Sequence, residues 1–145
     1  MAVKAVEIFK NFVQAWNSED YEKFASFFKD DLVYEDVPSG RVCNNIKELI
    51  TFSKSLHVDF PDHKWEIIST FSDGNKIASE TIWSGTFTHS TDPKVAVTGK
   101  HASARGVSIT EILNGKIYRN RDYYDGLSLQ QQLGMMPEMK PRELM

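Results

Sequence analysis

The sequence predicts one α+β domain whose helices and strands are segregated along the chain. Helical periodicity fills the first third of the sequence and alternating strand patterns fill most of the rest, which is typical of α+β architecture. The length of 145 residues suits a single compact domain. Hydrophobic residues make up 41% and aromatic residues 12% of the chain, enough for a sizeable core or, alternatively, for an aromatic-lined pocket. We predict one domain over residues 1–134 and a loosely ordered tail over residues 135–145.

Three helices are predicted in the first third of the chain. Apolar side chains recur at helical spacing in residues 3–16. Asn17 or Ser18 is the predicted N-cap of a second helix. A third helix is predicted to begin at Asn45, because Glu48 follows three residues later as in a capping box. The apolar faces carry Val6, Ile8, Phe9, Phe12, Val13 and Trp16 in the first helix, Phe24, Phe27 and Phe28 in the second, and Ile46, Leu49 and Ile50 in the third.

The remainder of the chain predicts strands separated by turns. A short strand alternates from Leu32 to Val37, and Pro38-Ser39-Gly40 ends it. Turns are predicted at Ser72-Asp73-Gly74-Asn75 and at Asn114-Gly115. A short amphipathic helix around Ser128 to Leu133 closes the domain. The longer strands are Trp65 to Phe71, Ile77 to His89, Val95 to Leu113, and Ile117 to Tyr124.

The Asn114-Gly115 turn decides which residues of the last two strands share a face. A two-residue turn would place Asp122 opposite Val107, whereas a three-residue loop with Gly115 in a bulge would place Asp122 opposite Gly106. We favour the bulge, because it gathers charges of both signs on one face, where they compensate each other. That face carries Val107, Ile109, Glu111, Ile117, Arg119, Arg121 and Tyr123. The other face carries Gly106, Ser108, Thr110, Tyr118, Asn120, Asp122 and Tyr124.

Two aspartates are candidate catalytic residues. Asp122 lies in a strand with aromatic residues on both sides, and a carboxylate on a concave, largely apolar face has a raised pKa that suits general acid–base catalysis. Alternatively, Asp122 pairs with a neighbouring arginine or caps the final helix. Alternation places Asp36 on one face with Tyr34, although an aspartate before Pro-Ser-Gly also suits a simple turn.

Charge and composition exclude several classes of protein. The formal net charge is -3 and no basic stripe is present, which argues against nucleic acid as a partner. The single cysteine, Cys43, cannot form an internal disulfide, and Glu7 and Lys10 interrupt any apolar signal core, so we expect a cytoplasmic protein. No apolar run is long enough to span a membrane. The four histidines lack ligand spacing and no phosphate-binding loop occurs, so neither a metal nor a cofactor is predicted.

Several motifs follow one another in a characteristic order. They are Tyr34-Glu35-Asp36 after two helices, Phe60-Pro61-Asp62 after a third, Asn114-Gly115-Lys116-Ile117 and Arg121-Asp122-Tyr123-Tyr124-Asp125 in the last strands, and Leu129-Gln130-Gln131-Gln132-Leu133-Gly134 at the end. Over roughly residues 4 to 134, this order resembles the SnoaL-like polyketide cyclases of the nuclear-transport-factor-2-like superfamily. The resemblance implies a cone: a curved mixed or antiparallel sheet wrapped around the N-terminal helices, also called a cystatin-like α+β roll. Because this fold hosts many activities and some binding proteins, the resemblance does not identify the reaction.

The resemblance also implies residue roles. In the polyketide cyclases the catalytic acid/base is the aspartate of an Arg-Asp-aromatic stretch in the last strand, so this role would fall on Asp122. The cyclases carry a histidine in the preceding strand, where this chain has Ser108, so polarisation of the substrate by imidazole is lost. The stretch around Asp36 resembles the turn that holds the base of ketosteroid isomerase. However, the tyrosine of that enzyme's first helix corresponds to Phe12, so ketosteroid isomerisation is not expected.

These observations predict a cofactor-independent enzyme that acts on a hydrophobic carbonyl compound by enolisation, aldol-type ring closure or isomerisation. Asp122 would transfer the proton, and Asp36 would be a second proton-transfer group or orient a water. Tyr34, Ser108, Asn120 and Tyr124 would bind substrate oxygens, and Phe12 and Trp16 would form an apolar wall. The alternatives are a binding protein for an apolar ligand and an interaction module. We also expect a homodimer through the sheet face that carries Val107, Ile109 and Tyr123.

Overall fold

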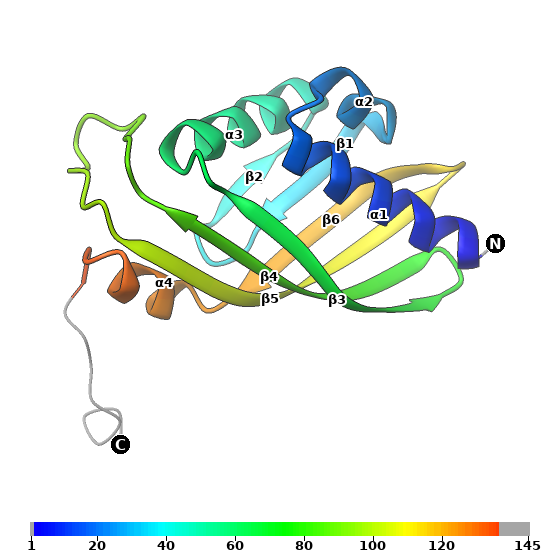
Figure 1. Ribbon diagram of the computed structural model, residues 1–145. Helices are drawn as coiled ribbons and strands as arrows, with labels where there is room; N and C mark the ends of the chain where they lie inside the picture. The colour runs from blue at the N-terminus through cyan, green and yellow to red at the C-terminus, as the bar shows by residue number, and fades with distance from the viewer. Residues whose placement is uncertain (1, 137–145) are drawn as a thin grey trace.

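The computed structural model describes residues 2–136, which form four helices and six strands (Figure 1). The elements in chain order are α1 (Ala2–Ser18), α2 (Tyr21–Ser26), β1 (Phe28–Asp36), β2 (Arg41–Cys43), α3 (Ile46–Asp59), β3 (Lys64–Asp73), β4 (Lys76–Thr86), β5 (His101–Leu113), β6 (Lys116–Tyr124) and α4 (Gly126–Gln132). The predicted α+β class is confirmed. The predicted tail falls mainly on residues 137–145, which lie outside the described residues.

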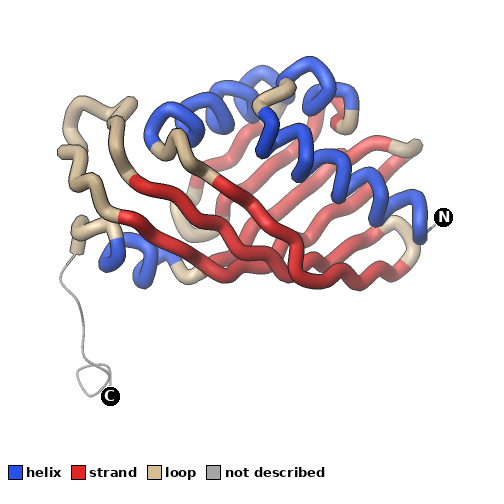
Figure 2. The backbone as a smooth tube through the Cα atoms, viewed as in Figure 1, coloured by secondary structure: helices blue, strands red, loops and turns tan. Residues whose placement is uncertain are grey.

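All six strands form one sheet in the order β2-β1-β6-β5-β4-β3. β1 runs parallel to β6, and every other neighbouring pair is antiparallel. Figure 2 shows the long strands bending together, so that the sheet curves around the N-terminal helices on one side. This mixed, curved and unclosed sheet is the predicted cone. Within residues 2–136, no helix is both long and apolar enough to cross a membrane.

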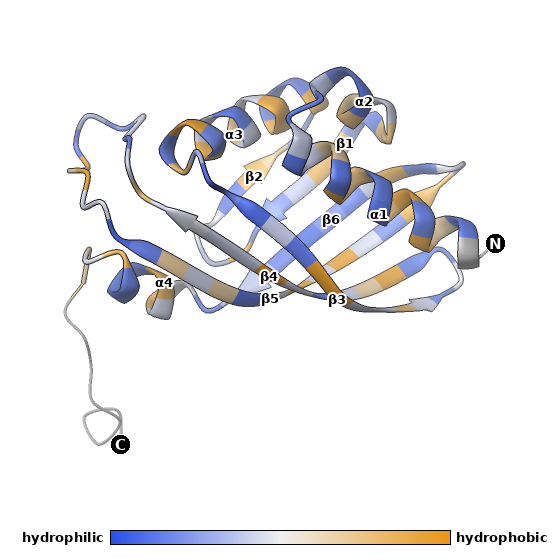
Figure 3. Cartoon of the chain, viewed as in Figure 1, coloured by the Kyte–Doolittle hydropathy of each residue, from blue (hydrophilic) through white to orange (hydrophobic). Residues whose placement is uncertain are grey.

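The buried faces of α1 and α2 contribute aromatic rings to the core on the concave side of the sheet. Figure 3 shows that α1 alternates between apolar and polar stripes along its length. Phe12 is fully buried at the centre of this cluster, and its ring makes edge contacts with Phe9, Trp16 and Phe24. Truncating such a side chain to alanine costs about 3–5 kcal/mol. These contacts hold α1 against the sheet.

The helix starts depend on local capping, which was predicted correctly for one of two helices. The Asn45 side chain accepts from Glu48 N at 2.9 Å, as predicted, and Glu48 Oε1 accepts from Asn44 N at 2.9 Å. The second helix is capped by Asp20 rather than by Asn17 or Ser18, because α1 continues through Ser18. Its predicted face is also shorter, since Phe27 is the C-cap and Phe28 already begins β1.

The strand boundaries differ from the prediction at two places. The short strand β2 was not predicted, because three residues give no periodic signal. The strands predicted to reach His89 and to begin at Val95 instead end at Thr86 and begin at His101. Between them, residues 87–100 form a loop held by Asp59 at the end of α3. The Asp59 carbonyl accepts from Thr88 N at 3.2 Å, and its carboxylate accepts from Thr91 N at 2.7 Å.

The β5–β6 register matches neither predicted alternative. Asn114 and Gly115 both have positive φ (52° and 77°) and form a two-residue turn, with Leu113 opposite Lys116. The bulge lies further along, where Tyr118 is the extra residue of β6. Asp122 therefore lies opposite Ser108. The other inward residues pair as Gly106 with Tyr124 and Thr110 with Asn120.

The predicted division into two faces nevertheless holds, with two exceptions in β6. Beyond the bulge, the register differs from the favoured prediction by an even number of residues. Because side chains alternate between the two faces, an even shift leaves them on the predicted face. The exceptions adjoin the bulge: Ile117, predicted on the outer face, is fully buried in the core, and Tyr118, predicted on the concave face, donates through its hydroxyl to Glu111 at 3.3 Å on the outer face. Arg121 also reaches Glu111 at 3.3 Å, so the predicted charge compensation on the outer face is present.

Candidate active site

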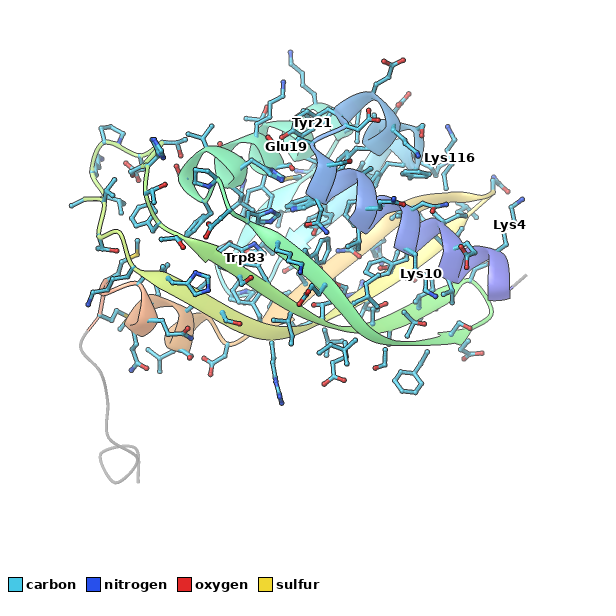
Figure 4. All side chains as sticks on the ribbon, viewed as in Figure 1. Lys4, Lys10, Glu19, Tyr21, Trp83 and Lys116 are labelled. Atoms are coloured by element: carbon cyan, nitrogen blue, oxygen red, sulfur yellow. The ribbon has the colours of Figure 1, made fainter. Side chains whose placement is uncertain are left out.

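A cavity of about 370 Å³ opens on the concave side of the sheet. Helices α1 and α3 and strands β3 and β4 contribute its apolar wall, whose aromatic members are Trp16, Phe52, Phe60, Trp65 and Trp83. Trp83, labelled in Figure 4, comes from β4 and packs edge-on against the Phe60 ring at 4.9 Å between centroids. The polar lining residues come mainly from β1, β5 and β6 and the turn after β1: Tyr34, Asp36, Ser39, Arg41, Thr81, Ser108, Asp122 and Tyr124. The cavity thus has an aromatic wall and a polar floor.

The parallel pairing of β1 with β6 builds the centre of this floor. Asp36 lies directly opposite Asp122 in the register, and Tyr34 lies opposite Asn120. Each aspartate binds a tyrosine from the other strand: Tyr34 donates to Oδ2 of Asp122, and Tyr124 donates to Oδ2 of Asp36 at 2.8 Å. Two carboxyl groups that are 86 residues apart in sequence therefore share one polar cluster.

Asp122 accepts three side-chain hydrogen bonds. Ser108 Oγ and Asn120 Nδ2 donate to Oδ1 at 2.6 and 2.9 Å, and Tyr34 donates to Oδ2. The Asp122 side chain is half-buried and faces the cavity. Burial is the main cause that raises its pKa from 3.8 to about 6, against the opposing effect of the three donors. Asp122 can therefore gain or lose a proton near neutral pH.

Asp36 is held by a different set of donors. Ser39 and Tyr124 both donate to Oδ2, and the residue is only 6% exposed. Burial raises the pKa of its carboxyl, while the hydrogen bonds from Ser39 and Tyr124 and the nearby Arg41 act in the opposite direction. The Asp36 carbonyl and the Ser39 hydroxyl also belong to the turn before β2. Asp36 is thus both a turn former and a cavity residue.

The two tyrosines remain protonated hydrogen-bond donors. Burial and the adjacent Asp122 raise the pKa of Tyr34 well above its usual value. Burial and the adjacent Asp36 likewise raise the pKa of Tyr124. Both phenols therefore serve as fixed donors to the carboxyl groups and not as acids.

The structure brings most of the predicted site residues to the cavity. Trp16, Tyr34, Asp36, Ser108, Asp122 and Tyr124 line it. Phe12 does not, because it is enclosed in the aromatic core behind the wall. Asn120 does not either, since it is 1% exposed and lies between Thr110, which donates to its Oδ1 at 2.6 Å, and Asp122. Both residues support the site from behind and do not face a substrate.

Sequence analysis missed several residues of the site. Arg41 reaches the cavity from β2, where its guanidinium lies 4.9 Å from the centre of the Phe52 ring. Thr110 orients Asn120 through a hydrogen bond. Its place in a row of polar side chains at alternate positions of the strand could have indicated this role. The wall residues Phe52, Leu56 and Phe60 come from α3 and its C-terminus, where helical periodicity could have suggested an apolar face.

Two histidines lie behind the wall at Trp16. The Trp16 indole N–H donates to Nε2 of His63 at 2.8 Å, and burial, with a contribution from His57, lowers the pKa of His63 to about 3. The His57 Nδ1–H donates to the Ser53 carbonyl at 2.8 Å. Neutral His63 therefore fixes the orientation of Trp16. Among residues 2–136, no cluster of three or more His, Cys, Asp or Glu side chains has a geometry that could hold a metal ion.

The fold and the site together define an α+β roll with a small-molecule cavity and carboxyl groups on its floor. The family model of the SnoaL-like polyketide cyclases matches residues 6–133, and the chain belongs to this family. No curated protein sequence matches the chain at a significant level.

Solved structures with the same fold share little sequence with this chain. A proposed SnoaL-like polyketide cyclase from Jannaschia sp. CCS1 has a TM-score of 0.83 and 15% identity, covering 94% of this chain and 96% of that one. AclR from Streptomyces galilaeus, a proposed hydroxylase, has a TM-score of 0.81 and 19% identity, covering 99% and 89%. An LEH-like epoxide hydrolase from M. tuberculosis has a TM-score of 0.70 and 19% identity, covering 91% and 90%. At these identities the likeness demonstrates the fold alone.

Proposed function

We propose that this protein is a cofactor-independent enzyme that moves a proton on a hydrophobic carbonyl compound, with Asp122 as the general acid–base group. The observation that supports this most strongly is a carboxyl group with a pKa of about 6 on the floor of an aromatic-walled cavity. Efficient general acid–base catalysis requires a group whose pKa lies near the working pH. Membership of the SnoaL-like cyclase family supports the same class of chemistry.

The proposed reaction class is enolisation, isomerisation or aldol-type ring closure. Proton transfer between carbon and oxygen needs an acid–base group beside the carbonyl and a wall that excludes water. Asp122 provides the first, and the aromatic side chains of α1, α3, β3 and β4 provide the second. Asp36 is a second proton-transfer group or the group that orients a water. The related folds include a proposed cyclase, a proposed hydroxylase and an epoxide hydrolase, so the exact reaction has to be identified by assay.

Solvent deuterium exchange tests the proposal directly. Polyketide-like, steroid-like and terpenoid ketones are incubated with the protein in D₂O, and deuterium at the carbon next to the carbonyl is followed by NMR. We expect exchange with at least one ketone, and its loss in Asp122→Asn with binding retained. Asp73→Asn, at the exposed end of β3, is the control for removal of one negative charge. Binding without exchange in either protein would refute catalysis and favour a ligand-binding protein.

We also propose that the chain forms a homodimer through the outer face of the sheet. Three large apolar side chains are exposed there, on β3, β5 and β6: Phe71 at 69%, Val107 at 40% and Tyr123 at 44%. An apolar patch with charged neighbours such as Glu111 and Arg121 is typical of an interface between copies. Sedimentation velocity should give a dimer for the native chain and a monomer for Phe71→Glu. Val58→Glu, an exposed apolar residue on α3, is the matched control and should remain dimeric.

A further inference from the structure

Four hydroxyl groups on the cavity floor donate to the two carboxyl groups, and the Thr81 hydroxyl donates to the Gly106 carbonyl. Tyr34 and Ser108 donate to Asp122. Ser39 and Tyr124 donate to Asp36. Each hydroxyl has a single proton. While both aspartates are ionised, this part of the floor therefore has no hydroxyl proton left for the oxygen atom of a ligand.

The lone pairs that remain free on the floor belong to the carboxyl groups. Oδ1 of Asp122 already accepts from Ser108 and Asn120, and Oδ2 accepts from Tyr34, which leaves Oδ2 with one free acceptor position. Both side-chain bonds to Asp36 end on Oδ2, so its Oδ1 receives no side-chain donor. With both groups ionised, this cluster of two carboxylates and four hydroxyls can only accept hydrogen bonds, and a side-chain donor left among the other lining residues is Arg41, which lies over the Phe52 ring. A ketone oxygen also only accepts, so the doubly ionised carboxyl cluster does not match a carbonyl ligand.

The surrounding charges favour one proton on this pair of aspartates. Asp36 and Asp122 face each other on adjacent strands, so each carboxylate opposes ionisation of the other. The titratable and charged neighbours of the pair are Tyr34 on β1, Arg41 and Cys43 on β2, and Tyr124 on β6. The residues that line the cavity from α1, α3, β3 and β4 are aromatic, aliphatic or a threonine, and do not titrate. Arg41 favours the ionised form of Asp36, which leaves the proton on Asp122.

We propose that the form of the site that binds a carbonyl substrate carries one proton, on Oδ2 of Asp122, and that Asp36 is the base for the substrate's C–H bond. This inference rests on the proposed function and divides its proton transfer between two residues. The Asp122 O–H donates to the carbonyl oxygen. Oδ1 of Asp36 takes the proton from the adjacent carbon, the C–H electron pair becomes the C=C bond of the enol, and the carbonyl oxygen takes the proton of Asp122.

This division keeps the charge of the floor constant. Before the step Asp122 is neutral and Asp36 carries one negative charge, and after it Asp36 is neutral and Asp122 carries that charge. No enolate has to form in isolation, and two adjacent buried carboxylates never coexist. The donors from Ser108, Asn120 and Tyr34 to Asp122 then stabilise the carboxylate that forms on it. If Asp122 acted alone, the one free position on its Oδ2 would have to donate a proton to the carbonyl oxygen and also accept the proton from the adjacent carbon.

A binding experiment separates the protonated donor from a general preference for apolar ligands. The probes are benzophenone and acetophenone, with diphenylmethane and ethylbenzene as the matched hydrocarbons without a carbonyl group. Binding is followed between pH 5 and pH 8 through the fluorescence of the tryptophans in the cavity wall. We expect the dissociation constant of at least one ketone to rise about tenfold or more from pH 5 to pH 8, as the Asp122 proton is lost. The hydrocarbons should show no such dependence.

The Asp122→Asn variant is the matched control, because its amide can donate at every pH. It should bind the same ketone with a dissociation constant that does not change between pH 5 and pH 8. Ketone binding by the native protein that is independent of pH would overturn the inference. So would an equal pH dependence for the hydrocarbons, or the absence of saturable binding by both ketones.

Deuterium exchange then tests the role of Asp36. With an enolisable ketone such as acetophenone, we expect Asp36→Asn to lose exchange while still binding the ketone more tightly at low pH, since Asp122 can still donate. Exchange by the native protein should pass through a maximum with pH, because it needs Asp36 ionised and Asp122 protonated. If Asp36→Asn exchanges normally and Asp122→Asn does not, the division of roles is wrong and the proposed function stands. If both variants exchange normally, the proposed function is wrong as well.

Discussion

Replacing Asp122 with asparagine should stabilise the folded protein above pH 6 while it removes activity. The Asp122 carboxyl keeps its proton up to a pKa of about 6 in the folded chain, against 3.8 for an ordinary aspartate. Between these values the folded state binds more protons than the unfolded state, so the free energy of unfolding falls as the pH rises. The destabilisation is absent below about pH 4 and complete above about pH 6 to 7.

The magnitude follows from the difference between the two pKa values. About two pH units, at about 1.4 kcal/mol for each, give about 3 kcal/mol at pH 7. Because Asp122 faces a cavity that opens to water, this figure is an upper bound. It is nevertheless a large share of the 5 to 15 kcal/mol that is typical of a folded domain. Asparagine cannot ionise, so Asp122→Asn escapes this cost.

Urea unfolding, followed by tryptophan fluorescence at half-unit steps from pH 4.5 to pH 7.5, measures the effect. The quantity of interest is the stability of Asp122→Asn minus that of the native protein, in which the titration of other groups cancels. We expect this difference to rise by up to about 2 kcal/mol across the range, because about 1 kcal/mol of the effect is already present at pH 4.5. Asp73→Asn is the control for charge removal. A difference that stays constant with pH would refute the argument that burial raises the pKa of Asp122.

Three further predictions concern residues behind the site. Thr110→Val should leave Oδ1 of Asn120 without its buried donor, costing about 1–3 kcal/mol in urea unfolding and lowering deuterium exchange, whereas Thr110→Ser should preserve both. His63 has a pKa of about 3 in the folded protein, against 6.5 when unfolded. As the pH falls below about 6.5, the unfolded state therefore binds a proton before the folded state does, and the free energy of unfolding decreases. His63→Gln should reduce this dependence of the free energy of unfolding on pH by up to about 1.4 kcal/mol per pH unit. Gly106→Ala would bring a Cβ to 2.7 Å from the Tyr123 carbonyl oxygen, and because backbone cannot move aside cheaply, unfolding should show a loss of about 1–3 kcal/mol.

Local signals in the sequence predicted local structure well. The Asn45 cap with Glu48 three residues later depends only on neighbouring residues, and it forms as predicted. The division of β5 and β6 into two faces was also confirmed beyond the bulge, because the register differs from the favoured prediction by an even number of residues. The position of the bulge at Tyr118 could not be predicted from the sequence, because no local pattern distinguishes a bulge in the turn from one a few residues away.

The centre of the candidate site depends on the pairing of two distant strands, which the sequence alone does not predict. Asp36 and Asp122 were predicted separately, each from its own strand, but their pairing follows from the parallel alignment of β1 with β6. Phe12 and Asn120 were predicted to line the cavity, but both are buried behind its lining. Helical and strand periodicity indicate which side chains point inward, but not how far each lies from the cavity. The additional layer of rings around Phe12, and the position of Asn120 behind Asp122, emerge only from the packing.

The residue at position 108 connects the departure from the family pattern to the proposed chemistry. The resemblance to the cyclases places a polarising histidine there, and this chain has Ser108 instead. The Ser108 hydroxyl is not aimed at a ligand, because its proton is donated to Oδ1 of Asp122 at 2.6 Å. A position that would polarise the substrate directly therefore supports the acid, and the donor to a carbonyl oxygen has to come from elsewhere on the floor. A protonated Asp122 can provide it, so the loss of the imidazole and the raised pKa of Asp122 belong to one account of this site.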